Sequence, residues 1–183
     1  MPQVFLGTMM LIWAVRKTAS NPAQQEMLNR ARWLISLLEE KEATPCTSTV
    51  NLAEYLRGCS HTKRGAEREA LEGVVHILDF NAHAAEIAAG LLDGIAQPIT
   101  AQHGRQIVKA DAQVVATAWA HGIDVFYTFD SGCEAMARRA GLTIGAIPNH
   151  SDDLGESQGQ PRISSHGQLK GTKSTRKPNR RKT

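Results

Sequence analysis

Two aspartates occupy positions where the sequence can support metal chemistry. Asp111 lies in the stretch 110–121, whose apolar residues recur at the spacing of one helical face. The apolar run 125–127 is typical of a buried strand, and Asp130 follows its carboxyl end, where open α/β sheets bind their ligands. Because a helix followed by a strand can bring such ends together, we expect the two carboxylates to meet and form a divalent-metal site.

Each aspartate also has an ordinary structural explanation. The predicted helix places Asp111 in its first turn, where the macrodipole favours a carboxylate. Asp130 is suited to cap the helix predicted over 131–141. Neither role competes with metal binding. A divalent ion at this edge would lower the pKa of a bound water and neutralise charge on a phosphate, as hydrolysis of a phosphodiester requires.

Three motifs resemble those of the PIN-domain family. They are KADAQVVATA (109–118), YTFD (127–130) and VNLAEYLRG (50–58), whose acid is Glu54, and the resemblance covers residues 3–148. It implies a three-layer α/β/α fold with a central parallel sheet. It also implies that Glu54, Asp111 and Asp130 are catalytic ligands of Mg²⁺ or Mn²⁺.

Within that family the chain is similar to the VapC-like toxins of toxin–antitoxin pairs. The resemblance implies a divalent-metal-dependent endoribonuclease that hydrolyses RNA, is inhibited by an antitoxin inserted at the acid site, and forms a homodimer. It further implies that Thr8 and Thr128 support the acids from behind, Thr8 through a water molecule.

The family's fourth acid is expected directly after the first strand, but VFLGTMMLI (4–12) has Gly7 at that position. Glycine offers no side-chain ligand, and the loss of one carboxylate is expected to lower the rate by orders of magnitude. The chain is therefore either an inactivated form of an enzyme or a non-catalytic PIN module that binds RNA or protein. A flavodoxin-like small-molecule binder is a remote third possibility, because no phosphate-loop motif is present.

The elements needed to position these residues follow from apolar periodicity and from turn and capping residues. Strands are predicted over 3–6, 43–47, 75–80, 125–127 and 142–147, and helices from 9, from Pro22, after Ser48, and over 64–75, 82–93, 110–121 and 131–141. Asn21, Ser48 and Asn81 are expected to cap helices. Strands that alternate with helices favour a parallel sheet covered on both faces. We expect Trp119 in the core, and Ala85, Ala88, Ala89 and Leu92 on the packed face of 82–93.

Charge divides the chain into two predicted parts, a domain over 1–149 and a disordered basic tail over 150–183. Eight of the 21 basic residues lie from Gln160 onward, where there is no acid, so 13 basic and 18 acidic residues give residues 1–159 a net charge of −5. Such a tail indicates nucleic acid or an acidic partner. Besides Arg162, the candidate RNA-binding residues of the tail are Lys170, Lys173, Arg176, Lys177, Arg180, Arg181 and Lys182.

Lys109, Arg138 and Arg139 are further candidates for RNA phosphates near the acids, although a solvated surface charge explains each of them alone. Three widely spaced cysteines without a CxxC pair argue against a disulfide framework and favour a reducing cytoplasm. The apolar run 4–15 is too short to span a bilayer, and its positive charges follow it rather than precede it. We therefore expect a cytoplasmic protein with no membrane association.

Overall fold

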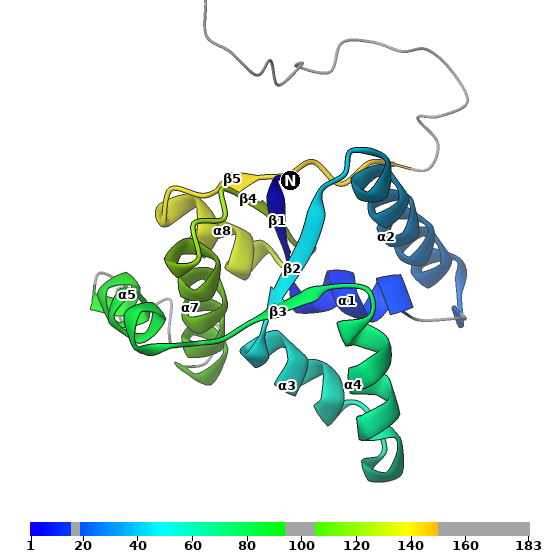
Figure 1. Ribbon diagram of the computed structural model, residues 1–183, viewed down its shortest axis with the longest axis horizontal. Helices are drawn as coiled ribbons and strands as arrows, with labels where there is room; N and C mark the ends of the chain where they lie inside the picture. The colour runs from blue at the N-terminus through cyan, green and yellow to red at the C-terminus, as the bar shows by residue number, and fades with distance from the viewer. Residues whose placement is uncertain (16–18, 94–104, 150–183) are drawn as a thin grey trace, which may run out of the picture.

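The computed structural model describes residues 1–15, 19–93 and 105–149. Five parallel strands form one sheet in the order β3-β2-β1-β4-β5. The strands are β1 (Gln3–Leu6), β2 (Thr44–Ser48), β3 (His76–Leu78), β4 (Val125–Tyr127) and β5 (Thr143–Ile144). The predicted parallel α/β architecture is confirmed (Figure 1).

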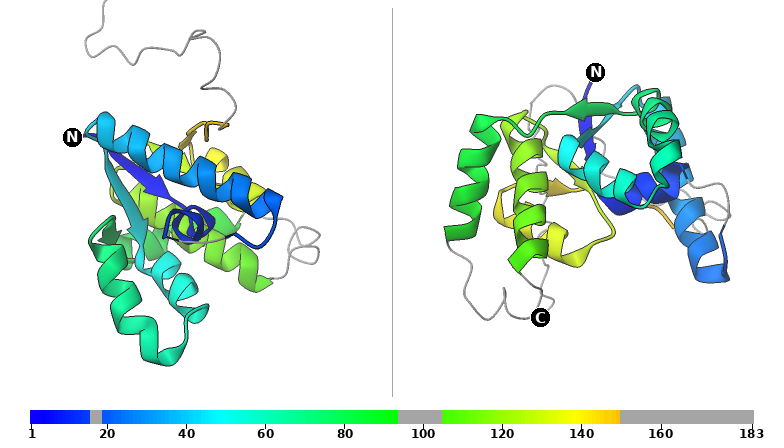
Figure 2. Two further views of the ribbon diagram at one scale, coloured as in Figure 1. Left: turned by 90° about the vertical axis from the view of Figure 1, so that its right-hand side faces the viewer. Right: turned by 90° about the horizontal axis from the view of Figure 1, so that it is seen from below.

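Helices cover both faces of the sheet, which gives three layers. The helices are α1 (Thr8–Val15), α2 (Pro22–Glu40), α3 (Thr49–Arg57), α4 (Arg64–Glu72), α5 (Ala82–Asp93), α7 (Arg105–Ala120) and α8 (Ser131–Arg139), with a short 3₁₀ turn at His61–Lys63. Figure 2 shows α1 and α2 on one side of the sheet and α7 and α8 on the other, with α5 outside α7.

Successive side chains of the central strands point to opposite faces of the sheet, so each face of the sheet has its own core. Phe5 of β1 and Phe126 of β4 stack with ring centroids 5.0 Å apart, and both belong to the core beneath α7 and α8. Val4 and Leu6, the neighbours of Phe5, turn to the opposite core with α1 and α2. This two-residue period is the reason that a short strand can bury side chains against two helical layers.

The predicted caps are present at three helices. Asn21 accepts a hydrogen bond from the Gln24 amide at 2.9 Å, with Pro22 at the first helical position. Ser48 accepts one from the Asn51 amide at 3.1 Å, and Asn81 accepts one from the Ala84 amide at 2.9 Å. Because Ser48 ends β2 and begins α3, its cap fixes the direction in which α3 leaves the sheet.

Three sequence-based predictions about helix faces and ends are wrong. Helix α7 begins at Arg105, so Asp111 lies in its second turn rather than its first, beyond the stabilising reach of the helix N-terminus. Ala84 and Ala88 are the buried alanines of α5, whereas Ala85 and Ala89 are exposed. Trp119 is 47% exposed, beside His83.

Two contacts hold the segment that follows β5 in place. Arg30 of α2 donates hydrogen bonds to the carbonyls of Ile147 at 2.9 Å and Pro148 at 3.1 Å. The Tyr127 ring occupies the space beside Gly145, where a Cβ would stand 2.1 Å from its Cε1 atom. The strand β4 that leads to Asp130 is therefore packed closely against the chain that follows β5.

The basic tail and its seven proposed RNA-binding residues lie outside the described residues, so the domain boundary near residue 149 stays a prediction. Among the described helices, none is long and apolar enough to cross a membrane.

Candidate metal centre

The candidate site lies where the carboxyl ends of β2, β1 and β4 meet. The chain adds β2 and β3 on one side of β1 and then returns to place β4 on the other side, which makes the gap between β1 and β4 a topological switch point. Ligands bind at such points because the loops that follow adjacent strands diverge there. Gly7 and Thr8 follow β1, and Thr128 and Asp130 follow β4.

A pocket of about 510 Å³ opens at this edge and contains all three predicted acids. Its lining combines these carboxylates with hydroxyl, amide and apolar side chains. The lining residues are Thr8, Met9, Ile12, Asn51, Glu54, Arg57, Ile107, Ala110, Asp111, Val114, Thr128, Asp130 and Cys133. Helices α1, α3, α7 and α8 thus contribute side chains from distant parts of the sequence.

Asp111 has an unfavourable environment for its charge. Its side chain forms no hydrogen bond or ion pair within the described part of the chain, as expected for a carboxylate projecting from mid-helix into the pocket. Burial raises its pKa to about 6, and the charges of Asp130 and Glu54 add to the effect. A cation would relieve both the repulsion and the missing hydrogen bonds.

Asp130 is held in place by the start of α8. Its Oδ1 atom accepts hydrogen bonds from the Gly132 amide at 2.8 Å and the Cys133 amide at 2.9 Å, which confirms the predicted capping role. Its own amide donates to Thr128 Oγ1 at 3.0 Å. Since the backbone engages Oδ1, the other carboxylate oxygen, Oδ2, remains for a ligand.

Glu54 projects from α3 and is bound by Thr8. The Thr8 hydroxyl donates to Glu54 Oε2 at 2.6 Å, and it accepts from the Asn51 side-chain amide at 2.9 Å. Thr8 thus lies behind an acid, as the family resemblance implies, but it contacts Glu54 directly. Thr8 is also the first residue of α1, so the geometry of β1 and α1 sets the position of this carboxylate.

Gly7 lies tightly against β4. Its amide donates to the Tyr127 carbonyl at 2.8 Å, and a Cβ at this position would stand 3.1 Å from Thr128 Oγ1. A larger residue therefore requires Thr128 to move by a few tenths of an ångström. Thr128 is buried and accepts a hydrogen bond from the amide of Asp130. A side chain at position 7 that moves Thr128 would therefore also disturb Asp130.

The acids of the pocket supply part of the oxygen ligands that a divalent cation requires. Asp111 and Asp130 border one small space, because a Cβ on Gly132 would lie 3.2 Å from Asp130 Oδ1 and 3.5 Å from Asp111 Oδ2. In the described ranges, however, no three His, Cys, Asp or Glu side chains are arranged to hold one ion. Thr8 engages one oxygen of Glu54 and position 7 has no acid, so an ion would have two neighbouring carboxylates and, from Glu54, the oxygen that Thr8 leaves free.

The basic residues near the pocket differ from those that the sequence pointed to. Lys109, Arg138 and Arg139 do not line the pocket, and Arg138 pairs with Glu134 at 2.9 Å. Arg57 does line it, and its guanidinium forms no ion pair or hydrogen bond with any described residue. Its position one turn after Glu54 on α3 was the available signal, since residues three apart share a helix face.

Cys133 also lines the pocket, and sequence reasoning gave it no role. Burial raises the pKa of its thiol, and the charges of Asp111, Asp130 and Glu54 raise it further. In the metal-free protein the thiol therefore stays protonated and is a poor nucleophile at neutral pH.

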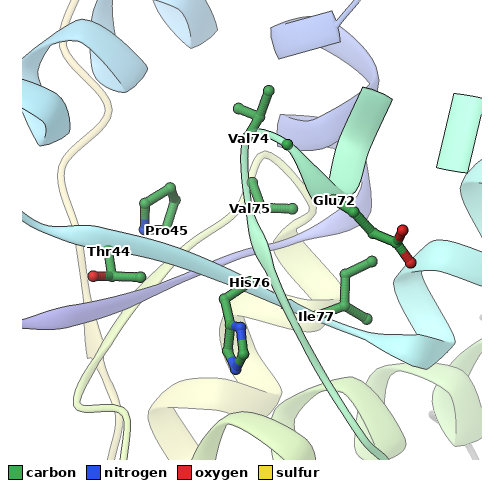
Figure 3. A pocket seen from close by; sticks show the side chains of 8 residues that line it. Thr44, Pro45, Glu72, Val74, Val75, His76 and Ile77 are labelled. Carbon is green, nitrogen blue, oxygen red and sulfur yellow. The ribbon is translucent and has the colours of Figure 1, made fainter. Parts of the chain in front are cut away.

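A second pocket, of about 460 Å³, lies at the opposite ends of β2 and β3. It is lined by Thr44, Pro45, Glu72, Gly73, Val74, Val75, His76 and Ile77. In Figure 3 the imidazole of His76 and the carboxylate of Glu72 point in different directions. Glu72 also pairs with Arg68 at 3.1 Å. The lining thus lacks a convergent group of polar side chains, and the acid pocket is the better candidate for chemistry.

Comparison with known proteins agrees with the geometry. The family model described as the PIN domain matches residues 10–139. A chain in the crystal structure of VapBC2 from Rickettsia felis bound to a promoter DNA fragment superposes with a TM-score of 0.54 at 19% identity, covering 78% of this chain and 97% of that one. A chain of DNA-bound VapBC from Salmonella typhimurium gives 0.52 at 18% identity, covering 79% and 98%. At such low identity these superpositions show a shared fold and nothing more. No curated protein matches this chain.

Proposed function

The chain belongs to the PIN-domain family, and from that premise we propose that it is a toxin-like endoribonuclease dependent on Mg²⁺ or Mn²⁺. The observation that carries this proposal is the placement of Glu54, Asp111 and Asp130 around one pocket, where the other two acids help to raise the pKa of Asp111. Carboxylates gathered in one pocket repel one another, and a divalent cation with oxygen ligands relieves that repulsion.

In this proposal Asp111 and Asp130 hold the ion, and Glu54 completes the set. When bound, the ion activates a water molecule and neutralises charge on the phosphate. The chain's own contribution is orientation. Amides at the start of α8 hold one oxygen of Asp130, and Thr8 holds one oxygen of Glu54.

Arg57 is the proposed phosphate contact for RNA at the mouth of the pocket. It is exposed, it lines the same pocket as the acids, and no described acid pairs with it. A guanidinium is suited to this task because its donors match two phosphate oxygens. Lys109, Arg139 and the basic residues of 160–183 are proposed as more distant RNA contacts.

An antitoxin is the proposed protein partner, since the fold is shared with chains from two VapBC crystal structures. Met9 and Ile107 line the acid pocket and are 37% and 58% exposed, which gives such a partner an apolar contact beside the acids. A homodimer and action in the cytoplasm complete the proposal.

One observation favours a second candidate, a non-catalytic PIN module that binds RNA or protein. Gly7 leaves the acid set one carboxylate short, and the described acids do not form a ready group of three. Such a module would keep the pocket and Arg57 for binding without cleavage.

Metal-dependent cleavage of RNA separates the two candidates. The purified chain is incubated with total RNA and Mn²⁺ or Mg²⁺, alongside Asp111→Asn and a chelator control. The nuclease proposal predicts slow cleavage that the chelator abolishes and that Asp111→Asn lowers at least about a hundredfold, because metal ligands act together. RNA that is bound but left intact with either metal would support the non-catalytic module instead.

A further inference from the structure

A chain of hydrogen bonds with a single direction runs along the wall of the acid pocket, from Ser48 at the end of β2 to Glu54. The hydroxyl of Ser48 donates to Asn51 Oδ1, and the Asn51 side-chain amide donates to Thr8 Oγ1 at 2.9 Å. The Thr8 hydroxyl in turn donates to Glu54 Oε2 at 2.6 Å. Ser48 and Asn51 are fully buried, so water does not substitute for these partners.

The direction of each bond follows from the number of hydrogens available. Glu54 as a carboxylate only accepts, so the single hydroxyl hydrogen of Thr8 is directed to it. Thr8 must therefore accept from its other neighbour, and in Asn51 only the amide nitrogen donates. The Asn51 carbonyl then faces Ser48, whose hydroxyl hydrogen it receives. Every donor points toward Glu54.

Helix formation alone does not account for the side chain of Asn51. The cap of α3 uses the backbone amide of residue 51, which any residue except proline supplies. Asparagine is also a poor choice for a buried helical position, because an unpaired amide is costly there. The contacts that its side chain does make are those with Ser48 and Thr8.

We propose that Asn51 is a positioning residue that acts through Thr8 to hold the Glu54 carboxylate with Oε2 engaged, which leaves Oε1 for a divalent cation. The proposal rests on the metal site of the proposed function. Without Asn51, the Thr8 hydroxyl is free to rotate and Glu54 samples other rotamers. Partners behind a metal ligand commonly change metal affinity by about 10–100-fold when they are removed.

The first measurement follows the chain in the metal-free protein. In ¹⁵N-labelled full-length protein, the side-chain amide hydrogens of Asn51 are expected to exchange slowly with solvent. In Thr8→Val the amide loses its acceptor, so its resonances shift and its exchange accelerates. Rapid exchange in the unsubstituted protein, or resonances unchanged by Thr8→Val, would overturn the proposed chain.

The second measurement is Mn²⁺ affinity, determined by calorimetry for the full chain with Mn²⁺ alone. Asn51→Leu keeps the side-chain size and is expected to weaken binding about tenfold. Thr8→Val should weaken it by at least as much, and the double variant should bind like Thr8→Val alone, since Asn51 acts through Thr8. Full additivity of the two effects would contradict the proposed order.

Thr47→Val is the matched control. Thr47 is also fully buried on β2, and its hydroxyl donates to the Leu6 carbonyl at 3.0 Å, outside the chain that leads to Glu54. Both Thr47→Val and Asn51→Leu are expected to lower the melting temperature, but only Asn51→Leu should lower Mn²⁺ affinity. Equal affinity of Asn51→Leu and the unsubstituted protein would overturn the inference and leave the proposed function standing. Absence of Mn²⁺ binding by the unsubstituted protein would overturn both.

Discussion

The carboxylate of Asp111 is half-buried beside two other acids and has no hydrogen-bond donor among the described residues. Its folded-state pKa of about 6 lies above the ordinary 3.8, so the folded protein disfavours the charged form. Below about pH 3 the carboxyl is mostly protonated in both states and carries no penalty. As the pH rises through about 6, the folded state loses stability relative to the unfolded one.

Asp111→Asn is therefore expected to stabilise the metal-free protein at pH 7.5 by about 1 kcal/mol, after allowance for solvent screening, and to have little effect below about pH 3. Urea denaturation at both pH values measures this. Asp124→Asn, at an exposed position outside the pocket, is the control. Equal stability of Asp111→Asn and the unsubstituted protein at pH 7.5 would show that the carboxylate bears no such penalty.

Gly7→Asp tests whether the missing acid limits activity. It is expected to raise Mn²⁺-dependent RNA cleavage at least about tenfold, because it restores a carboxylate to the set. Thr128 must shift to admit the new side chain, since a Cβ would lie 3.1 Å from its Oγ1 atom. Thr128→Ser removes the methyl group of Thr128, so that the side chain moves aside more easily. It should therefore increase the gain in RNA cleavage when it is combined with Gly7→Asp. Gly7→Asn is the uncharged control, and activity restored equally by asparagine would argue against a ligand role.

At the scale of single residues, motif order in the sequence selected Glu54, Asp111 and Asp130, and the structure places all three around one pocket. It did not reveal what each carboxylate contacts, since those partners come from other elements. Thr8 and Glu54, which form a hydrogen bond, are 46 positions apart in the sequence. The tight fit of Gly7 depends on Thr128, which follows a different strand. Local pattern predicts an element and its faces, whereas such contacts depend on register between strands.

At the scale of elements, capping residues and strand alternation were sufficient to predict most of the order of strands and helices. Prediction failed where packing decides the result. Helix α7 extends upstream to Arg105, beyond its clear apolar period, and this extension moves Asp111 away from the helix N-terminus. Strand β5 shrinks to Thr143–Ile144, because the sheet pairs only the residues that face β4. Trp119 is exposed although its neighbours in sequence are apolar.

The junction of β4 and β5 provides a test at this scale. Gly145 accommodates the ring of Tyr127, and a Cβ there would lie 2.1 Å from Cε1. Gly145→Ala is expected to lower stability by about 1–3 kcal/mol through overpacking. Tyr127→Leu should recover part of this loss in the double variant, as thermal denaturation of all four proteins will show. Gly90→Ala, where a Cβ meets nothing within 4 Å, is the control. No recovery in the double variant would place the strain elsewhere.

At the scale of the whole molecule, charge is separated along the chain. Residues 1–159 carry a net charge of −5, whereas eight basic residues and no acid follow from Gln160 onward. Residues 1–159, with this net negative charge and an acid-lined pocket, repel RNA at long range, and the basic segment offsets that repulsion by neutralising phosphates. The segment lies outside the described residues, so its role rests on its charge alone.

Truncation after Leu154 removes all eight basic residues of the segment. The truncated protein is expected to keep its melting temperature and Mn²⁺ affinity, because the described core lies within residues 1–149. RNA binding should weaken, and the slope of log affinity against log salt should become shallower by up to about 6, since each neutralised phosphate of a single strand contributes about 0.7. Fluorescence anisotropy with a labelled single-stranded RNA at several salt concentrations measures both quantities.

A full-length variant with the eight basic residues changed to glutamine separates charge from length. If the segment captures RNA by phosphate neutralisation, this variant should match the truncated protein in affinity and in salt slope, because counterion release depends on the charges alone. A variant that instead binds like the unsubstituted protein would assign the effect to chain length. If truncation leaves both affinity and slope unchanged, the phosphate contacts must lie within residues 1–154, where exposed Arg57 at the mouth of the acid pocket is the first residue to substitute.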